Sequence, residues 1–310
     1  MPRAGLPREL YDLVVDYLHA ERATLGSCAL VCRAWIPASR FHLFAHISLT
    51  EHEGHVAARL NELLASPHAT FASAVRSLDF YNALSPVQIR HSRTGRIQVK
   101  TLVEIVPRIA QLHHIQTLTL SDLPLGILPA FSKVKTLSLV GITAGPVLLQ
   151  LATHLPKLTR LTLKRVHAIP YRASSPAACG PEVKSLQRLA IRGSSLAFLG
   201  WLAVLAPRTS TLDLGDFCPS EVAYLSEYLR KLDRPLAQLH LGLSQGADVR
   251  EFAWEELVRV LGVGTRVIVC MDQPERESGV EGDEQDDEDV SILRFQFREL
   301  EKRGMLVVRR

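Results

Sequence analysis

Four cationic side chains occupy matching places in two neighbouring stretches of the chain, RLTLK and RLAIR. Arg160 and Lys164 flank the first stretch, and Arg188 and Arg192 flank the second. The first and fifth residues of a β-strand point to the same face, so all four would meet on one surface if the two strands pair. Guanidinium and ammonium groups bind carboxylates and phosphates. The spacing therefore predicts a cluster that recognises an acidic or phosphorylated segment of a partner. A solvated edge, or an ion-pair partner for an acidic stretch of this chain, is the alternative.

Cysteine and histidine pairs are the other groups that could hold a metal ion. Cys28 and Cys32 lie four residues apart, but a zinc site needs four ligands and no second pair lies nearby in sequence. Core packing explains both thiols better. Two histidine pairs form no recognisable ligand pattern either: His52 with His55, and His113 with His114. We therefore predict no metal and no cofactor.

Motifs of enzymatic chemistry are absent from the sequence. It has no nucleophile elbow, dinucleotide fingerprint or zinc-protease helix, and Gly262 and Gly264 are too few to form a phosphate-binding loop. No catalytic residue is predicted, and we expect a protein that is not an enzyme.

Composition narrows the class of protein further. The chain has 310 residues, 47% of them hydrophobic and 22% charged, which suits a globular protein with a sizeable core. Its five cysteines are scattered and follow no leader-like segment, so we expect a reduced protein of the cytoplasm or nucleus. The longest apolar run, Leu196–Ala206, is far shorter than the roughly 20 residues that span a bilayer. We expect a buried helix there and no membrane partner.

Charge is distributed unevenly along the chain. The net charge is +4, yet residues 275–289 carry nine acidic side chains against the single Arg276, which leaves +12 for the rest. Runs of like charge are usually solvated, so we predict an acidic disordered loop at 273–290. The basic stretch Arg90–Lys100 permits a nucleic-acid hypothesis, but no aromatic residues alternate with its cations. We expect no nucleic-acid partner.

A short phrase with the spacing L-x-x-L-x-L recurs from residue 46 onward. Its clearest copies are IQTLTL, VKTLSL, LTRLTL, LQRLAI, TSTLDL and LAQLHL. The anchor leucines from Leu118 to Leu239 are 19 to 28 residues apart, which brackets the period of leucine-rich repeats. Because strand side chains alternate between faces, each phrase predicts a strand with one apolar side.

Apolar segments at helical spacing, such as EVAYLSEYLRKL, separate these phrases, so each repeat is expected to be a strand followed by a helix. One repeat cannot bury its own apolar side, whereas stacked repeats can. The predicted fold is α/β: an irregular leucine-rich-repeat solenoid over residues 46–310, with a curved parallel sheet inside and helices outside. Surface loops are expected at 85–96 and 170–182. A helix that stops near Gly304, followed by a short strand, would close the stack.

Residues 1–45 carry a different pattern. Pro7 suits a first helical turn, and Leu10, Val14 and Leu18 then recur along one stripe. The stretch TLGSCALVCRAW continues with apolar residues three to four apart, which predicts two or three short helices in all. A module this small leaves apolar surface uncovered, so we expect it to dock on a partner helix. Capping of the first repeat is the alternative.

These opening residues resemble the F-box. The matching residues are Leu6-Pro7-x-Glu9-Leu10, Leu25-x-x-Cys28-x-Leu30-Val31-Cys32-Arg33-x-Trp35, Arg40 and Leu43-Phe44. The resemblance is especially to fungal F-box proteins in which the motif runs into leucine-rich repeats. It implies an adaptor of a Skp-Cullin-F-box ubiquitin ligase, whose F-box helices interlock with the Skp adaptor subunit. The positions that match that interface are Leu6, Pro7, Leu10, Leu18, Val31, Cys32 and Trp35.

The sequence thus predicts a substrate-recognition adaptor in two parts. The resemblance implies that the module docks on the Skp adaptor, and through it on a Cullin, while the repeats hold an unidentified protein substrate for ubiquitination. A leucine-rich-repeat scaffold outside any ligase is the alternative function.

Overall fold

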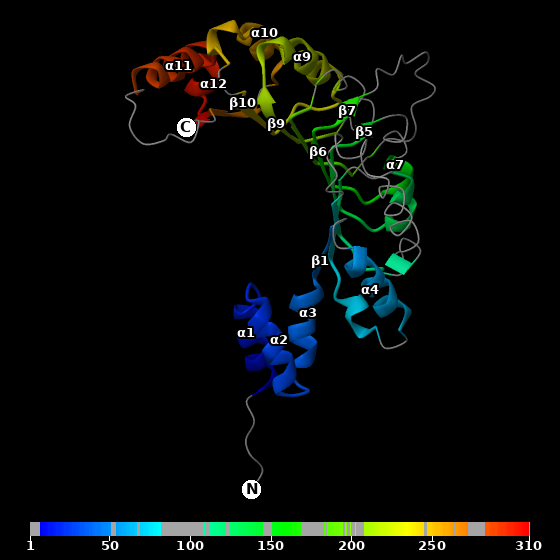
Figure 1. The fold of residues 1–310 in the computed structure, drawn as a ribbon. Coiled ribbons are helices and arrows are strands. Elements are labelled where there is room, and N and C mark those ends of the chain that lie inside the picture. The colour runs from blue at the N-terminus through cyan, green and yellow to red at the C-terminus, as the bar shows by residue number, and fades with distance from the viewer. Residues whose placement is uncertain are drawn as a thin grey trace. The chain divides into compact units, whose positions relative to one another are not determined.

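The chain divides into two compact units, Met1–Val134 and Lys135–Arg310, whose elements are drawn in Figure 1. The predicted loops at 85–96 and 170–182 lie outside the residues that the structure describes. The structure is a computed structural model that describes residues 7–50, 54–66, 69–81, 108–109, 112–121, 125–144, 151–168, 183, 185–194, 196, 199, 202, 208–244, 247–262, 264–271 and 283–309.

The first unit opens with three short helices, α1 (Arg8–Tyr17), α2 (Arg22–Val31) and α3 (Ile36–Phe44). Pro7 stands directly before α1, and its carbonyl accepts a hydrogen bond from the backbone N–H of Leu10 at 3.0 Å. The helices pack around a small core to which Val15, Leu25 and Cys28 contribute buried side chains. The predicted number of helices is thus confirmed.

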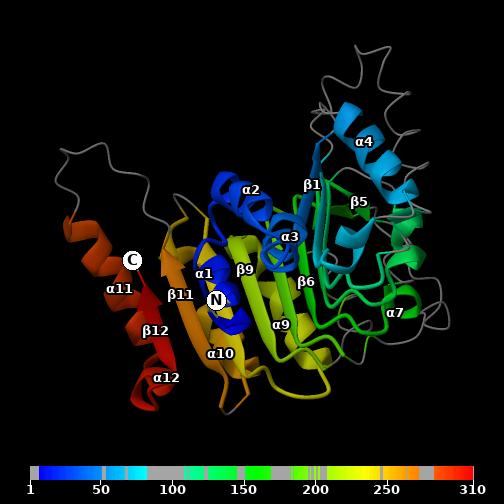
Figure 2. The same ribbon diagram turned by 90° about the horizontal axis from the view of Figure 1, so that it is seen from below.

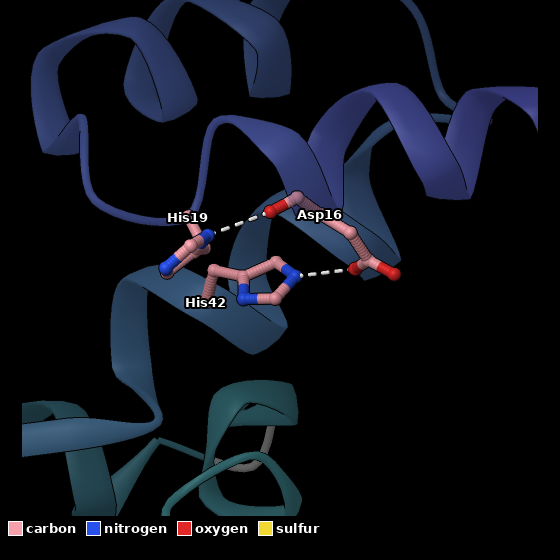
Figure 3. A network of polar contacts seen from close by, with 3 residues as sticks. All are labelled: Asp16, His19 and His42. Atoms are coloured by element: carbon pink, nitrogen blue, oxygen red, sulfur yellow. Dashed lines mark hydrogen bonds and ion pairs between the residues drawn. The ribbon is translucent and has the colours of Figure 1, made fainter.

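A polar contact also joins α1 to α3 (Figure 3). The Nε2 of His42 on α3 lies 2.7 Å from the Oδ1 of Asp16 on α1. His19 follows α1, and its Nδ1 donates to the backbone carbonyl of Asp16 at 2.8 Å. Because the Asp16 carboxylate is 62% exposed, we expect this contact to contribute at most about 1 kcal/mol.

Three parallel strands follow in the first unit. The other elements of this unit within the described residues are β1 (His46–Thr50), α4 (Gly54–Ala65), η2 (Thr70–Ser73), β2 (Ser77–Tyr81), β3 (Thr117–Ser121) and η3 (Leu125–Phe131). β2 pairs with β1 on one side and with β3 on the other, and Leu78 lies opposite Leu118. Both leucines are fully buried, as the repeated phrase predicts.

The second unit continues the same pattern with seven described strands in one sheet. They are β4 (Thr136–Val140), β6 (Arg160–Lys164), β8 (Arg188–Arg192), β9 (Thr211–Phe217), β10 (Gln238–Leu243), β11 (Arg266–Met271) and β12 (Leu306–Arg309). They pair in that order, all in parallel. Two further strands, β5 (Thr143–Ala144) after β4 and β7 (His167–Ala168) after β6, form a separate parallel pair.

Helices and 3-10 turns alternate with these strands. They are α7 (Leu151–His154), η7 (Pro219–Glu221), α9 (Val222–Lys231), η8 (Val249–Glu251), α10 (Trp254–Val260), α11 (Asp283–Gln296) and α12 (Arg298–Lys302). Figure 2 shows α9 and α10 on one side of β9 and β11. The second and fourth residues of β4, β6, β8, β9, β10 and β11, such as Leu161 and Leu163, are buried at 1% exposure or less. The predicted α/β repeat solenoid, with strands and helices in separate layers, is confirmed.

Residues with positive φ lie at or near the carboxyl ends of several strands. Gly141, Arg165, Gly193 and Asp216 adopt φ values between 51° and 65°. The N–H of Arg165 donates to the carbonyl of Arg192 at 2.9 Å, and the N–H of Gly193 donates to the Asp216 carboxylate at 3.0 Å. These bonds tie each turn to the next repeat and hold the strand ends in line, which offsets the strain of a left-handed backbone at the non-glycine positions.

An aromatic cluster closes the C-terminal end of the second unit. Trp254 stacks on Phe252 with ring centroids 4.5 Å apart and meets Phe297 edge-on at 5.2 Å. Gly304 has a φ of +67° after α12, and β12 then pairs with β11. The predicted terminal helix and strand are both confirmed.

The acidic segment differs from its prediction. Residues 283–290, expected to belong to a disordered loop, form the start of α11, while 273–282 lie outside the described residues. Two effects favour a helix here. The helix dipole stabilises carboxylates at a helix N-terminus. The apolar side chains of Val290, Leu293 and Phe297 are buried, which anchors the helix to the repeats. Apolar anchors downstream thus extend the helix into the charged run.

Gly262 provides a test of packing between repeats. A Cβ at this position would lie 2.3 Å from the Cβ of Pro235. We expect Gly262→Ala to lower the free energy of unfolding by about 1–3 kcal/mol in urea titrations, because backbone must move. Gly26→Ala is the control: its Cβ would meet nothing within 4 Å, and in the middle of α2 it should stabilise by about 0.5–1 kcal/mol. Equal effects of the two substitutions would contradict this packing.

Candidate interaction surfaces

Helix α1 carries two apolar stripes. Tyr11, Val15 and Leu18 are buried or half-buried. The second stripe, Leu10, Leu13, Val14 and Tyr17, recurs at positions i, i+3, i+4 and i+7 and is exposed. The sequence placed Leu18 on the stripe of Leu10 and Val14, but packing within the module turns it to the inner stripe. The outer stripe is not needed for the core of the module.

The C-terminal half of α2 is also apolar and exposed. Leu30 and Val31 are 88% and 66% exposed, and Tyr17 on α1 is 87% exposed. Large apolar side chains in this setting are typical of surfaces that a partner covers. Leu13, Tyr17 and Leu30 were not among the predicted interface positions. Only the packing of α2 and α3 shows which side of each helix stays open.

The positions matched to the Skp interface fall into three groups. Leu6 lies outside the described residues. Four of them are exposed: Pro7, Leu10, Val31 and Cys32. Two are half-buried: Leu18 and Trp35. The Trp35 ring lies 5.9 Å from the Tyr11 ring, so it supports α1 from within the module.

The candidate metal ligands do not gather into a site among the described residues. Cys28 is buried, as core packing predicts, but Cys32 is exposed, so the prediction of core packing was wrong for Cys32. His113 and His114 are both exposed, His52 lies outside the described residues, and only the backbone of His55 is described. No group of three histidine, cysteine or carboxylate side chains is arranged to hold a cation within this part of the chain. No described helix is both long and apolar enough to cross a membrane.

Strand pairing brings the four predicted cations of the second unit together. Arg160 lies opposite Arg188, and Lys164 lies opposite Arg192. All four side chains are exposed, and they stand at the first and fifth positions of β6 and β8. The strand alternation predicted this common face correctly. We call it the basic face.

Asp213 on β9 lies beside two of these cations. Its Oδ2 is 3.2 Å from the guanidinium of Arg188 and 3.6 Å from that of Arg192. The Asp213 side chain is only 13% exposed, whereas both arginines remain about half exposed. Only the register of β8 and β9 reveals that Asp213 joins the two arginines.

The positive field extends across the neighbouring strands. Burial lowers the pKa of His240 on β10, and the cations Arg188, Arg309 and Arg266 lower it further, while Asp213 acts in the opposite direction. A lowered pKa keeps this imidazole neutral at pH 7.

The strands of the first unit carry a different polar cluster. Asp79 on β2 lies 3.4 Å from the Nε2 of His46 on β1, and the hydroxyl of Tyr81 lies 3.4 Å from the same carboxylate. Burial raises the pKa of Tyr81, and the Asp79 charge raises it further. The phenol thus stays protonated and donates to Asp79. This cluster was not predicted, because His46 on β1 comes from a different repeat than Asp79 and Tyr81 on β2.

Comparisons with known proteins add little to these observations. No family model matches the chain, and no curated protein matches it. Among solved structures, it is similar to the leucine-rich-repeat-containing protein LegL7 from Legionella pneumophila, with 16% sequence identity and a TM-score of 0.34. The similarity covers 73% of this chain and 81% of LegL7. The fold is a leucine-rich-repeat-like solenoid. The register of the chain's own strands, rather than this similarity, carries that conclusion.

Proposed function

We propose that this chain is a substrate-recognition adaptor of a Skp-Cullin-F-box ubiquitin ligase. The observation that carries the proposal is the outer apolar stripe of α1, together with Leu30 and Val31 of α2, on a module whose sequence resembles the F-box. A helical partner would bury these side chains, and burying a Leu or Val side chain contributes about 1.5–3 kcal/mol. The Skp adaptor is the partner that the resemblance implies.

The repeats supply the second half of this function. Parallel strands present their first, third and fifth residues on one face, and such faces commonly bind other proteins. A substrate held there would be brought close to the ubiquitin-charged enzyme through Skp and Cullin. The chain then acts by proximity and contributes no reactive group of its own. The described cysteines are free, which fits a reducing compartment such as cytoplasm or nucleus.

A scaffold outside any ligase is the second candidate. It is favoured by the repeat fold alone, because an open strand face serves assembly as well as ubiquitination. The two functions differ in one property: only the ligase adaptor recruits a Cullin.

Co-expression with a Skp adaptor tests the proposal. We expect the two proteins to co-elute in size-exclusion chromatography as a one-to-one complex. We also expect that added Cullin joins this complex. Co-elution with Skp but not with Cullin would favour the scaffold. No co-elution from the intact, folded chain would overturn the adaptor function and leave the module as a cap of the first repeat.

A further inference from the structure

The open strand face of the second unit carries a strong excess of positive charge. Five of its cations stand at the first or fifth position of a strand: Arg160, Lys164, Arg188, Arg192 and Arg266. The sixth, Arg309 on β12, lies opposite Cys270, the fifth residue of β11. At the first, third and fifth positions of the described strands of this unit, Asp213 is the only carboxylate. Neutral polar or small residues fill most other positions, including Thr136, Ser138 and Thr162.

Within the four-residue basic face, two cations have no carboxylate partner in the part of the chain that the structure describes. Among the described residues, no carboxylate pairs with Arg160 or Lys164, and both side chains are exposed. Each also stands directly opposite another cation on β8. Like charges opposite one another on paired strands are destabilising. The fold therefore keeps an unfavourable arrangement that a bound anion would relieve.

The other two cations of the basic face, Arg188 and Arg192, already hold a carboxylate. Asp213 accepts a hydrogen bond from Arg188 at 3.2 Å and lies within ion-pair distance of Arg192. Each guanidinium has five N–H donors, so both arginines retain donors for a ligand. Asp213 restrains their side chains before any ligand arrives, which reduces the entropy lost on binding.

A glycine on β9 leaves space for the Arg192 side chain. A Cβ at Gly215 would lie 2.9 Å from the Cγ of Arg192, so the Arg192 side chain crosses the space that a larger residue would fill. Gly242 occupies the corresponding position on β10. The Arg192 side chain thus lies along the sheet toward Asp213 rather than rising from it.

The spacing of these cations fits an extended chain. Positions one and five of a strand are about 13 Å apart, because each residue rises about 3.3 Å. An extended peptide presents every second side chain on one side, so acidic residues at i, i+2 and i+4 span the same distance. A segment lying along β6 and β8 could then place carboxylates against both ends of the basic face.

We propose that the basic face of β6 and β8 binds an extended acidic segment of a partner protein, with carboxylates at alternate positions against Arg160, Lys164, Arg188 and Arg192. We choose an acidic ligand because its negative charges complement the four exposed cations of this face. The inference deepens the proposed function, since it rests on the repeats being the substrate-binding part and names the substrate chemistry.

Fluorescence anisotropy with a labelled peptide, Gly-Glu-Ser-Glu-Ser-Glu-Gly, tests the inference on the full chain. We expect saturable binding that the glutamine version of the peptide does not show. Arg160→Glu with Lys164→Glu should weaken binding by at least about tenfold, and the double glutamine variant by less. Arg234→Glu with Arg259→Glu makes the same charge change at exposed cations away from this face. This control should bind within about twofold of the original chain.

Three results would overturn the inference. The first is no binding of the glutamate peptide, and the second is equal weakening by both charge reversals. The third is binding that appears only after Glu275, Glu277 and Glu281 are changed to glutamine, since the chain's own acidic run would then be the occupant. The Skp measurement is independent of all three. Peptide binding without Skp binding would overturn the adaptor function and leave this inference standing.

Discussion

Replacement of Leu10 and Val31 by aspartate is expected to weaken binding of the Skp adaptor by at least about a hundredfold. Both side chains are exposed and apolar on the free module. In a complex they would be buried, so the variant loses apolar contact and places two carboxylates in an interface that offers them no solvation. Because neither residue belongs to the core formed by Val15, Leu25 and Cys28, the module itself should still fold.

Isothermal titration calorimetry with purified Skp adaptor measures this effect. Leu63→Asp with Phe295→Asp is the matched control, because these apolar residues are 45% and 73% exposed on α4 and α11, outside the module. The control should bind as the original chain does. Unchanged affinity of the Leu10 and Val31 variant would contradict the role given to this surface, provided that far-UV circular dichroism shows a folded chain.

Trp254→Ala should lower the free energy of unfolding by about 3–5 kcal/mol. The side chain is 1% exposed, lies between Phe252 and Phe297, and donates a hydrogen bond from Nε1 to the Val249 carbonyl at 2.9 Å. Alanine would leave a large cavity at the end of the repeat stack and an unpaired carbonyl. The last repeats should therefore unfold at lower denaturant concentration.

Urea unfolding followed by circular dichroism measures the loss. Trp254→Phe retains the ring and loses only the hydrogen bond and some contact, so its cost should be about 1–2 kcal/mol. Phe295→Ala, at an exposed position of the nearby α11, should stay within about 0.5 kcal/mol of the original chain. A loss below about 1 kcal/mol for Trp254→Ala would show that the aromatic cluster does not hold the end of the stack.

The leucine phrase predicted most of the strands because it combines two independent signals. Its fixed spacing marks a strand, and its recurrence marks a stack of strands. β11 was missed because its sequence, RVIVCM, buries Val267 and Val269 where other repeats use leucine. β-branched residues serve that strand equally well. The recurrence that identified its neighbours was absent there.

The surfaces were harder to predict than the strands. Alternation along a strand needs only the sequence, so the basic face of Arg160 and Arg188 could be placed in advance. The contact of Asp213 with Arg188 and Arg192 depends on the register of separate repeats. The exposure of Leu13 and Leu30 depends on how three helices pack. Local pattern thus indicates which residues could bind, and tertiary packing decides which of them stay available.

Hydrogen–deuterium exchange of the full chain, with and without a Skp adaptor, tests the central claim most directly. The account predicts slower amide exchange in α1 and α2 when the adaptor is present, and unchanged exchange in the strands of the second unit. Unchanged exchange in α1 and α2 at saturating adaptor, or protection confined to the strands, would contradict the claim that the N-terminal module is the docking surface.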